Sequence, residues 1–332
     1  MTAARTQKLD PNELIQEFER LRRELTVLCY RMSGSIDEAE DLVQDTYLRA
    51  WRAADRFEGR SSLRTWLYRI ATNVCLTALE REERRMLPSG LVPTDPEPVT
   101  SDSYKGPSPR WLTPAPDRLA VPLADDPAEI TVTRSHLRLA IIAALQFLPP
   151  RQRVVLLLRD VLAFPASDVA NFLGISTPAV KSLLQRARGR MDEVSPQPDA
   201  SLEPEDPAAQ ALVNRYMTVF QEADVTLLEQ VLRDDASIEV APLGIFKSGK
   251  EVCIPYLAGS VLRLPGEYRM LPTSANGQPA AVAYRRGKPG EYDAFGLAVL
   301  TVTSEHITRI SVFADGQFVE RWGFPSKLVS PL

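Results

Sequence analysis

Two all-α modules followed by an α+β domain are the fold class that this 332-residue sequence predicts. Apolar residues recur at helical spacing through residues 12–85 and again through residues 133–194, with a proline-rich acidic stretch at 86–132 between them. After a second spacer at 195–206, residues 207–332 show two helical patterns and then short segments rich in Val, Ile, Tyr, Phe and Thr. Helices followed by a run of strands predict an α+β domain.

The first module reads as helix almost throughout. One apolar stripe consists of Leu14, Phe18, Leu21, Leu25 and Leu28, and a second consists of Ala39, Leu42, Val43, Thr46, Tyr47 and Ala50. A further helix is expected from about Ser62 to Arg85, because no proline interrupts that stretch.

The linker at 86–132 contains ten prolines, which exclude a continuing helix and favour an extended chain. Trp111, Leu112 and Leu119 are costly to leave in water, so we expect part of the linker to dock as an ordered strap.

The second module predicts four helices, of which the last two form a helix-turn-helix. Ala166 to Leu173 reads as its first helix, Gly174 supplies a turn residue that adopts positive φ easily, and Ser176 or Thr177 caps the next helix. In that helix Val180, Leu184 and Ala187 are expected to face inward. The opposite face carries Lys181, Ser182, Gln185 and Arg188 and no acid, which is typical of a helix that contacts DNA. The alternative is a solvated surface helix.

The last domain predicts helices at 208–222 and 226–233, then an antiparallel meander. Its expected strands are 237–241, 267–272, 280–284, 294–303 and 306–313.

Charge is segregated along the chain although the net charge is only −4. Residues 49–85 carry a net +4 and residues 134–193 a net +5, whereas the stretches around them are acidic. The apolar segments are too short for a membrane span, and the start of the chain lacks the pattern of a secretory signal. Three cysteines far apart in sequence favour a reducing cytoplasm, and two isolated histidines predict neither a metal site nor a cofactor.

Three blocks of residues 12–193 resemble the extracytoplasmic-function (ECF) group of bacterial RNA polymerase sigma factors. They are DEAEDLVQDTYLRAWR at 37–52, FEGRSSLRTWLYRIATNVCL at 57–76, and LPPRQRVVLLLRDVLAFPASDVANFLGISTPAVKSLLQRAR at 148–188. The resemblance implies binding to core polymerase by the first block, recognition and melting of the promoter −10 element by the second, and recognition of the −35 element by the third. It implies no catalytic residue.

Site residues follow from this resemblance. The candidates for core polymerase binding are Asp41, Leu42, Val43, Gln44, Asp45 and Arg49. The candidates for −10 contact are Arg60, Ser61 and Ser62 in the loop and Arg69, Asn73 and Thr77 on the helix, where they recur as a polar stripe. The candidates for −35 contact are Thr177, Lys181, Ser182, Gln185, Arg186, Arg188 and Arg190. Trp66 fits a core position better than a platform for base stacking.

Residues 207–332 resemble the SnoaL-like branch of the NTF2 fold, a cone with an internal pocket. In a fused sigma factor this implies control of promoter activity in cis, with a small-molecule ligand as a further candidate partner. The alternative function is a SnoaL-like enzyme or ligand sensor joined to a DNA-binding regulator, for which His306 and Asp315 are the candidate acid-base pair. The sequence leaves open whether a separate anti-sigma factor binds the chain.

Overall fold

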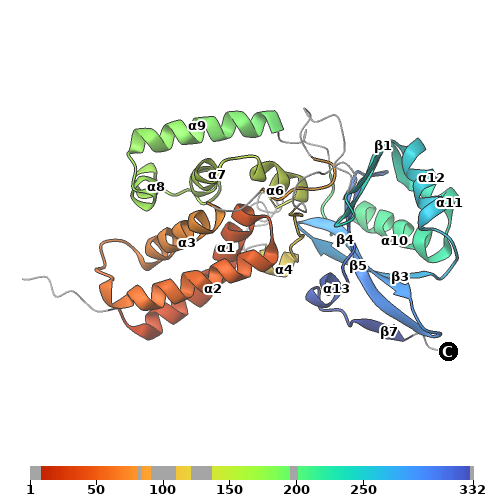
Figure 1. Cartoon of the computed structure of the whole chain (residues 1–332), viewed down its shortest axis with the longest axis horizontal. Helices are drawn as coiled ribbons and strands as arrows, with labels where there is room; N and C mark the ends of the chain where they lie inside the picture. Colours follow the sequence, from red (N-terminus) through yellow and green to blue (C-terminus); the bar gives the residue numbers. More distant parts are fainter. Residues whose placement is uncertain (1–8, 81–83, 91–109, 121–136, 195–200, 330–332) are drawn as a thin grey trace, which may run out of the picture. The chain divides into compact units, whose positions relative to one another are not determined.

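Two structural units form from interleaved stretches of the chain. The computed structural model describes residues 9–80, 84–90, 110–120, 137–194 and 201–329 (Figure 1). One unit, the helical unit, combines residues 1–85 with 118–195, and the other, the sheet unit, combines 86–117 with 196–332. The linker expected at 86–132 is thus divided between the two units after residue 117.

Three helices build the first part of the helical unit: α1 (Pro11–Ser33), α2 (Ile36–Ala53) and α3 (Leu63–Leu79), with a 3-10 turn η1 (Ala54–Arg56). The side chain of Asp10 caps α1 by accepting the Asn12 N–H, and Gly34 ends it with a φ of 74°. Ser35 then caps α2. Both predicted apolar stripes lie in the core, apart from a half-buried Tyr47.

Helix α3 ends earlier than expected, at Leu79 rather than Arg85. Residues 84 and 85 are not helical, and the extended backbone of Met86 donates to Arg110 O and accepts from Leu112 N. These hydrogen bonds are incompatible with a helix at Met86. The predicted end at Arg85 was therefore wrong: the pairing of Met86 with the chain near Trp111, which the local sequence does not reveal, requires an extended backbone there.

The second part of the helical unit contains the four expected helices. They are α6 (Leu139–Gln146), α7 (Pro150–Leu156), α8 (Ala166–Leu173) and α9 (Thr177–Val194), with a π-helical turn η2 (Leu157–Val161) after α7. The expected helix start at Thr133 lies outside the described residues. Gly174, with a φ of 62°, ends α8, and Ser176 caps α9 through the Ala179 N–H. The helix-turn-helix forms as its turn and cap residues predicted.

The two parts of the helical unit pack together through buried polar and aromatic groups. Arg153 of α7 donates to the carbonyl oxygens of Met32, Gln146 and Leu148 and to the Gln146 side chain. Gln146 in turn donates to Arg31 O at 3.3 Å. The Tyr68 ring of α3 meets the Phe164 ring before α8 edge-on at 5.0 Å. The C-terminal end of α1 is therefore satisfied by residues from α6 and α7.

Two cysteines that are distant in sequence meet in the same core. The thiols of Cys29 and Cys75 lie 3.6 Å apart on α1 and α3, both fully buried. The hydrogen bond to Cys75 and burial raise the pKa of Cys29, so Cys29 packs as a neutral thiol.

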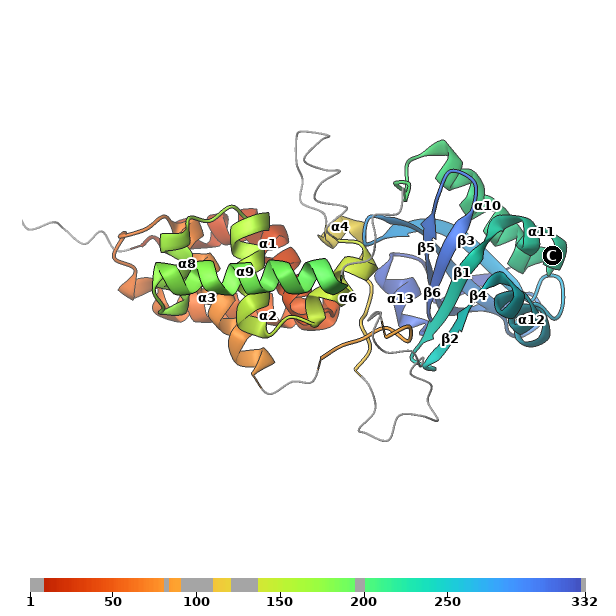
Figure 2. The ribbon, with the colours of Figure 1, turned by 90° about the horizontal axis from the view of Figure 1, so that it is seen from above.

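The sheet unit begins with helices α10 (Pro207–Glu222) and α11 (Val225–Val231) and continues into a mixed sheet of order β2-β1-β6-β5-β4-β3. The strands are β1 (Leu232–Ala241), β2 (Ile245–Ser248), β3 (Tyr268–Ala275), β4 (Gln278–Arg286), β5 (Glu291–Val302), β6 (Ile307–Phe313) and β7 (Lys327–Val329), the last of which pairs with β5. Helices α10, α11 and α12 (Lys250–Ser260) gather on one side of the sheet and share its core (Figure 2).

The topology departs from the expected meander at one pairing. Strands β3 to β6 run antiparallel as predicted, but β6 also pairs with β1 in parallel. Short strand patterns do not reveal which strand will neighbour β1, because that pairing is set by the crossover through α12. The sequence reading also missed β2, β7, α13 (Gln317–Arg321) and α12, whose interior Pro255 argues against a helix.

Part of the linker docks on the sheet unit, as expected for Leu112. Met86 pairs with Trp111, and Pro116 pairs with Ala275 at the end of β3. Ala115 and Asn276 are joined twice, because Asn276 N donates to Ala115 O and Ala115 N donates to Asn276 Oδ1. We call residues 86–90 and 110–117 the strap. Leu119 is half-buried in the short helix α4 (Asp117–Ala120) beyond it.

Candidate nucleic-acid interface

Helix α3 presents the predicted polar stripe to solvent. Arg69, Asn73 and Thr77 are exposed, whereas Leu67 and Ala71 on the other face are fully buried. Trp66 is 6% exposed and packs on Phe57 at 5.2 Å, which is a core position. The helix can therefore offer one amide, one hydroxyl and one guanidinium along a single accessible face.

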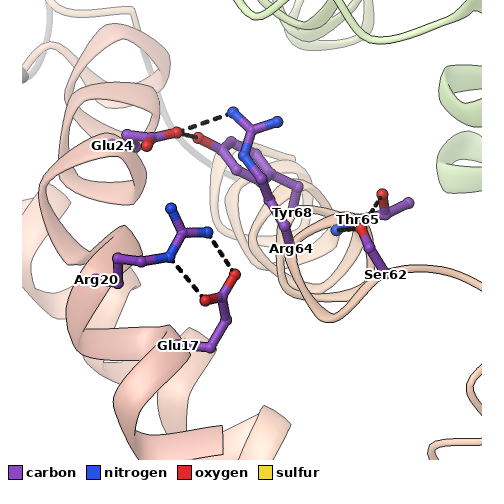
Figure 3. Close-up of polar contacts among 7 residues, drawn as sticks. All are labelled: Glu17, Arg20, Glu24, Ser62, Arg64, Thr65 and Tyr68. Carbon is purple, nitrogen blue, oxygen red and sulfur yellow. Dashed lines mark hydrogen bonds and ion pairs between the residues drawn. The ribbon is translucent and has the colours of Figure 1, made fainter. Parts of the chain in front are cut away.

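A polar cluster fixes the orientation of this helix on α1 (Figure 3). Glu24 of α1 accepts from Arg64 at 2.9 Å and from the Tyr68 hydroxyl at 2.7 Å. Burial, and then the charge of Glu24, raise the pKa of Tyr68, so the phenol remains a donor. Arg64 also stacks over the Tyr68 ring at 4.9 Å and the Phe164 ring at 5.2 Å. One guanidinium thus connects α1, α3 and the segment before α8.

The three candidates for −10 contact in the loop before α3 differ in their hydrogen bonds and ion pairs. Ser62 caps α3 by accepting the Thr65 N–H at 3.1 Å, and its hydroxyl also meets Thr65 Oγ1 at 2.8 Å (Figure 3). Ser61 is exposed. Arg60 is highly exposed and pairs with Glu58 at 2.9 Å, a surface ion pair that contributes little stability. All three candidates are exposed, and Ser62 in addition caps α3.

On α2, four of the six residues predicted to bind core polymerase are exposed, and two are buried. Asp41, Gln44, Asp45 and Arg49 are exposed, while Leu42 and Val43 are 8% and 3% exposed and belong to the core. Sequence reasoning missed Leu48 and Trp51, which are 39% and 46% exposed on the same helix. Their signal was available, because both fall outside the apolar stripe of α2 and large exposed apolar side chains mark interaction surfaces.

Helix α9 carries the cationic face expected of a recognition helix. Val180 and Ala187 are fully buried, Leu184 is half-buried, and Thr177 is half-buried at the first turn. The remaining candidates are exposed: Lys181, Ser182, Gln185, Arg186, Arg188 and Arg190. Arg188 is engaged by Asp160 of η2, with Nε to Oδ2 at 2.8 Å and NH2 to Oδ1 at 2.7 Å. That hydrogen-bonded pair raises the pKa of Arg188 and competes with any phosphate for its guanidinium.

The sheet unit encloses an apolar pocket between α10, α12 and the sheet. Of the candidate acid-base pair, His306 lies in the turn between β5 and β6, where its backbone pairs with Thr303, and Asp315 is exposed before α13. Neither residue lines the pocket. None of the helices in the described residues contains an apolar stretch of the length that spanning a bilayer requires.

The comparisons with known proteins agree with this geometry. The family model for sigma-70 region 2 matches residues 18–85, and the model for sigma-70 region 4 matches residues 138–191. Two such regions in this order define a sigma factor of RNA polymerase.

Two relatives from Mycobacterium tuberculosis extend the match over the whole chain. The chain is 42% identical over 315 residues to the ECF RNA polymerase sigma factor SigG, covering 93% of this chain and 83% of that protein. It is 29% identical over 330 residues to SigJ, covering 96% and 94%. The chain belongs to the ECF RNA polymerase sigma factors, which direct the polymerase to promoters. Core RNA polymerase and promoter DNA are therefore its partners.

A solved structure shows the same fold. The crystal structure of M. tuberculosis SigJ superposes with a TM-score of 0.60 at 24% identity, over 94% of this chain and 99% of that one. The predicted class, two helical sigma modules followed by an α+β domain, is confirmed.

Proposed function

We propose that this sigma factor reads the −10 element with the exposed stripe of α3 and the loop before it, and the −35 element with the cationic face of α9. One observation supports this most: on both helices the polar candidates face solvent while the opposite face forms the core. On α3 the contacts are Arg69, Asn73 and Thr77, with Arg60 and Ser61 from the loop. On α9, Lys181, Ser182 and Gln185 reach base edges, and the arginines hold phosphates.

Core polymerase binding is assigned to α2. The exposed residues Asp41, Gln44, Asp45 and Arg49 provide polar contacts, and Leu48 and Trp51 provide apolar anchors. Leu42 and Val43 act through packing, because their side chains support α2 from within the core.

Asn73→Ala and Lys181→Ala test the assignment to DNA. Each variant is expected to lower run-off transcription from the cognate promoter about 5- to 100-fold, since a good base contact contributes about 1–3 kcal/mol. Affinity for core polymerase should stay within about twofold of the unaltered protein. Asn214→Ala and Lys288→Ala, exposed positions of the sheet unit, are matched controls. Equal losses of core affinity and transcription would contradict the assignment.

The ion pair between Asp160 and Arg188 gives a second prediction. Asp160→Asn is expected to tighten promoter binding about two- to fivefold, because the guanidinium is released for a phosphate at the cost of only a surface ion pair. Fluorescence anisotropy at several salt concentrations measures this effect. Asp192→Asn removes the same charge from the exposed face of α9. If it tightens binding equally, net charge and not release of Arg188 is responsible.

The sheet unit is proposed to control promoter recognition in cis. Residues 86–117 are the first part of the linker between the −10 module and the −35 module, and their strap residues are hydrogen-bonded to the sheet unit. In addition to the contacts of Ala115, Ser89 N donates to the buried carboxylate of Glu239 at 3.2 Å, and Gly277 N donates to Asp117 Oδ1 at 2.7 Å. Released and extended, residues 86–117 would span at most about 110 Å. Docking therefore shortens the tether between the two DNA-binding modules.

The sheet unit is assigned to ligand binding and not to catalysis. Its pocket is apolar, and neither member of the candidate acid-base pair reaches it. A bound small molecule would act by changing how the strap docks.

A further inference from the structure

The pocket of the sheet unit has the size of a small aromatic molecule. Its volume is about 130 Å³, close to the roughly 150 Å³ of an engineered apolar cavity that stays dry and binds benzene. Phe220, Met270, Phe295 and Ile310 contribute to its wall. A pocket of this size and lining is suited to a single ring and not to a long chain or a polar metabolite.

Three tyrosines break the apolar character of the wall. Tyr216 is 1% exposed and Tyr268 is 7% exposed, and both line the pocket together with the half-buried Tyr256. Among the described residues, none of the three hydroxyls has a hydrogen-bond partner. Other buried tyrosines of the same unit differ, because Tyr284 donates to Pro325 O at 2.8 Å and Tyr292 donates to Gly266 O at 2.9 Å.

The hydroxyls of Tyr216, Tyr256 and Tyr268 are not among the fully buried polar atoms that lack a partner in the described residues. A tyrosine hydroxyl beside a cavity can satisfy its donor with water or with a bound ligand. All three tyrosines line the same pocket, and the rings of Tyr216 and Tyr268 both pack against Phe220, at 4.8 Å and 6.1 Å. They therefore bring three phenol donors to the wall of one cavity.

The pocket selects against charge. Burial raises the pKa of Tyr216, of Tyr256 and of Tyr268, so all three phenols are neutral donors at physiological pH. No charged side chain is among the residues that line the pocket in the described part of the chain. The charged groups around it lie outside the wall: Lys247 is 5.9 Å from the Tyr256 ring centre, and the exposed Arg285 and Arg263 act on the pKa of Tyr268 against the effect of burial. An ionic ligand in the pocket would pay its desolvation cost without a charged side chain in the wall.

We propose that the pocket binds a neutral, mainly apolar molecule with one ring and a hydrogen-bond acceptor, such as a carbonyl or ester oxygen, that accepts from the Tyr216 and Tyr268 hydroxyls. The proposal deepens the assignment of the sheet unit to ligand binding and rests on it for its regulatory meaning. Binding itself is measured without transcription, so the two can fail separately.

Titration calorimetry on the full chain tests the proposal with three matched probes. Methyl benzoate has the ring and the acceptor, toluene has the ring alone, and benzoate has the ring and a negative charge. Methyl benzoate is expected to bind at least tenfold more tightly than benzoate. Comparable binding of benzoate, or no binding of methyl benzoate and toluene at millimolar concentration, would overturn the proposal.

Removing single hydroxyls separates the contribution of the hydrogen-bond donors to binding from that of the shape of the pocket. Tyr216→Phe and Tyr268→Phe are each expected to weaken methyl benzoate binding about three- to tenfold and to leave toluene unchanged or slightly tighter. Tyr284→Phe removes a hydroxyl outside the pocket and should change neither probe. Ala283→Leu adds bulk to the pocket wall and should weaken both probes. An equal response of methyl benzoate and toluene to the hydroxyl variants would show that no acceptor is recognised.

The assay also distinguishes this site from the proposed control in cis. If a ligand binds but run-off transcription is unaffected by variants of the strap, the pocket stands and the regulatory role falls. If strap variants alter transcription and no probe binds, the regulatory role stands and the proposed ligand site falls.

Discussion

Arg153→Met is expected to destabilise the helical unit by about 3–5 kcal/mol, because it removes a buried charged donor and leaves its acceptors unpaired. The guanidinium donates to the carbonyl oxygens of Met32, Gln146 and Leu148 and to the Gln146 side chain. Burial lowers the pKa of Arg153 to about 10, so the group remains charged at neutral pH. Methionine preserves the apolar stem and supplies no donor.

Urea denaturation followed by circular dichroism gives the loss of stability, and hydrogen exchange assigns it to the helical unit. Exchange should accelerate at the C-terminal turn of α1 and in α7 and remain unchanged in β4 and β5. Arg151→Met, an exposed position on α7, is the matched control and should cost less than about 0.5 kcal/mol. A similar small cost for Arg153→Met would mean that the carbonyls find other partners.

Leu112→Ala is expected to release the strap from the sheet unit. Leu112 is fully buried, and truncating such a leucine costs about 2–5 kcal/mol. The hydrogen bonds of Ser89, Ala115 and Asp117 remain and contribute roughly 0.5–1.5 kcal/mol each, so release requires a loss at the upper end of the range for Leu112→Ala. Exchange at the amides of Met86, Leu112 and Ala115 should then become fast, and run-off transcription should change because the tether between the modules lengthens.

Leu264→Ala serves as the control, since Leu264 is 63% exposed in the sheet unit. Asn276→Gly offers a second route, because glycine keeps the positive φ of 56° at the turn and removes the side-chain acceptor of Ala115 N. Strap release without any change in transcription would remove the basis for control in cis.

The helical periodicity of the sequence predicted both helical modules and the exposed faces of α3 and α9. Asn73 on α3 and Lys181 on α9 face solvent because the apolar residues of each helix lie on its opposite face and form the core. The turn of the helix-turn-helix was predicted from Gly174 and Ser176, because its conformation depends only on neighbouring residues.

Features that depend on residues far apart in sequence were not predictable. Arginine is seldom fully buried, so nothing in the pattern around Arg153 marks it as an internal donor. The pairing of Asp160 with Arg188, the parallel pairing of β1 with β6 and the early end of α3 each require the partner to be known. The place of Tyr216 in the pocket wall was equally unpredictable, since in the sequence it occupies an ordinary apolar position of α10.

The interleaving of the two units has a consequence for proteolysis. A single cleavage between residues 195 and 200 would break the covalent connection, yet the C-terminal fragment would still hold residues 86–117 of the N-terminal fragment. The two fragments should therefore co-elute on gel filtration as a nicked complex. That single cleavage would not liberate a free sigma fragment, because the strap is joined to the helical unit at both of its ends; release requires further cleavages on both sides of the strap, or competition for it.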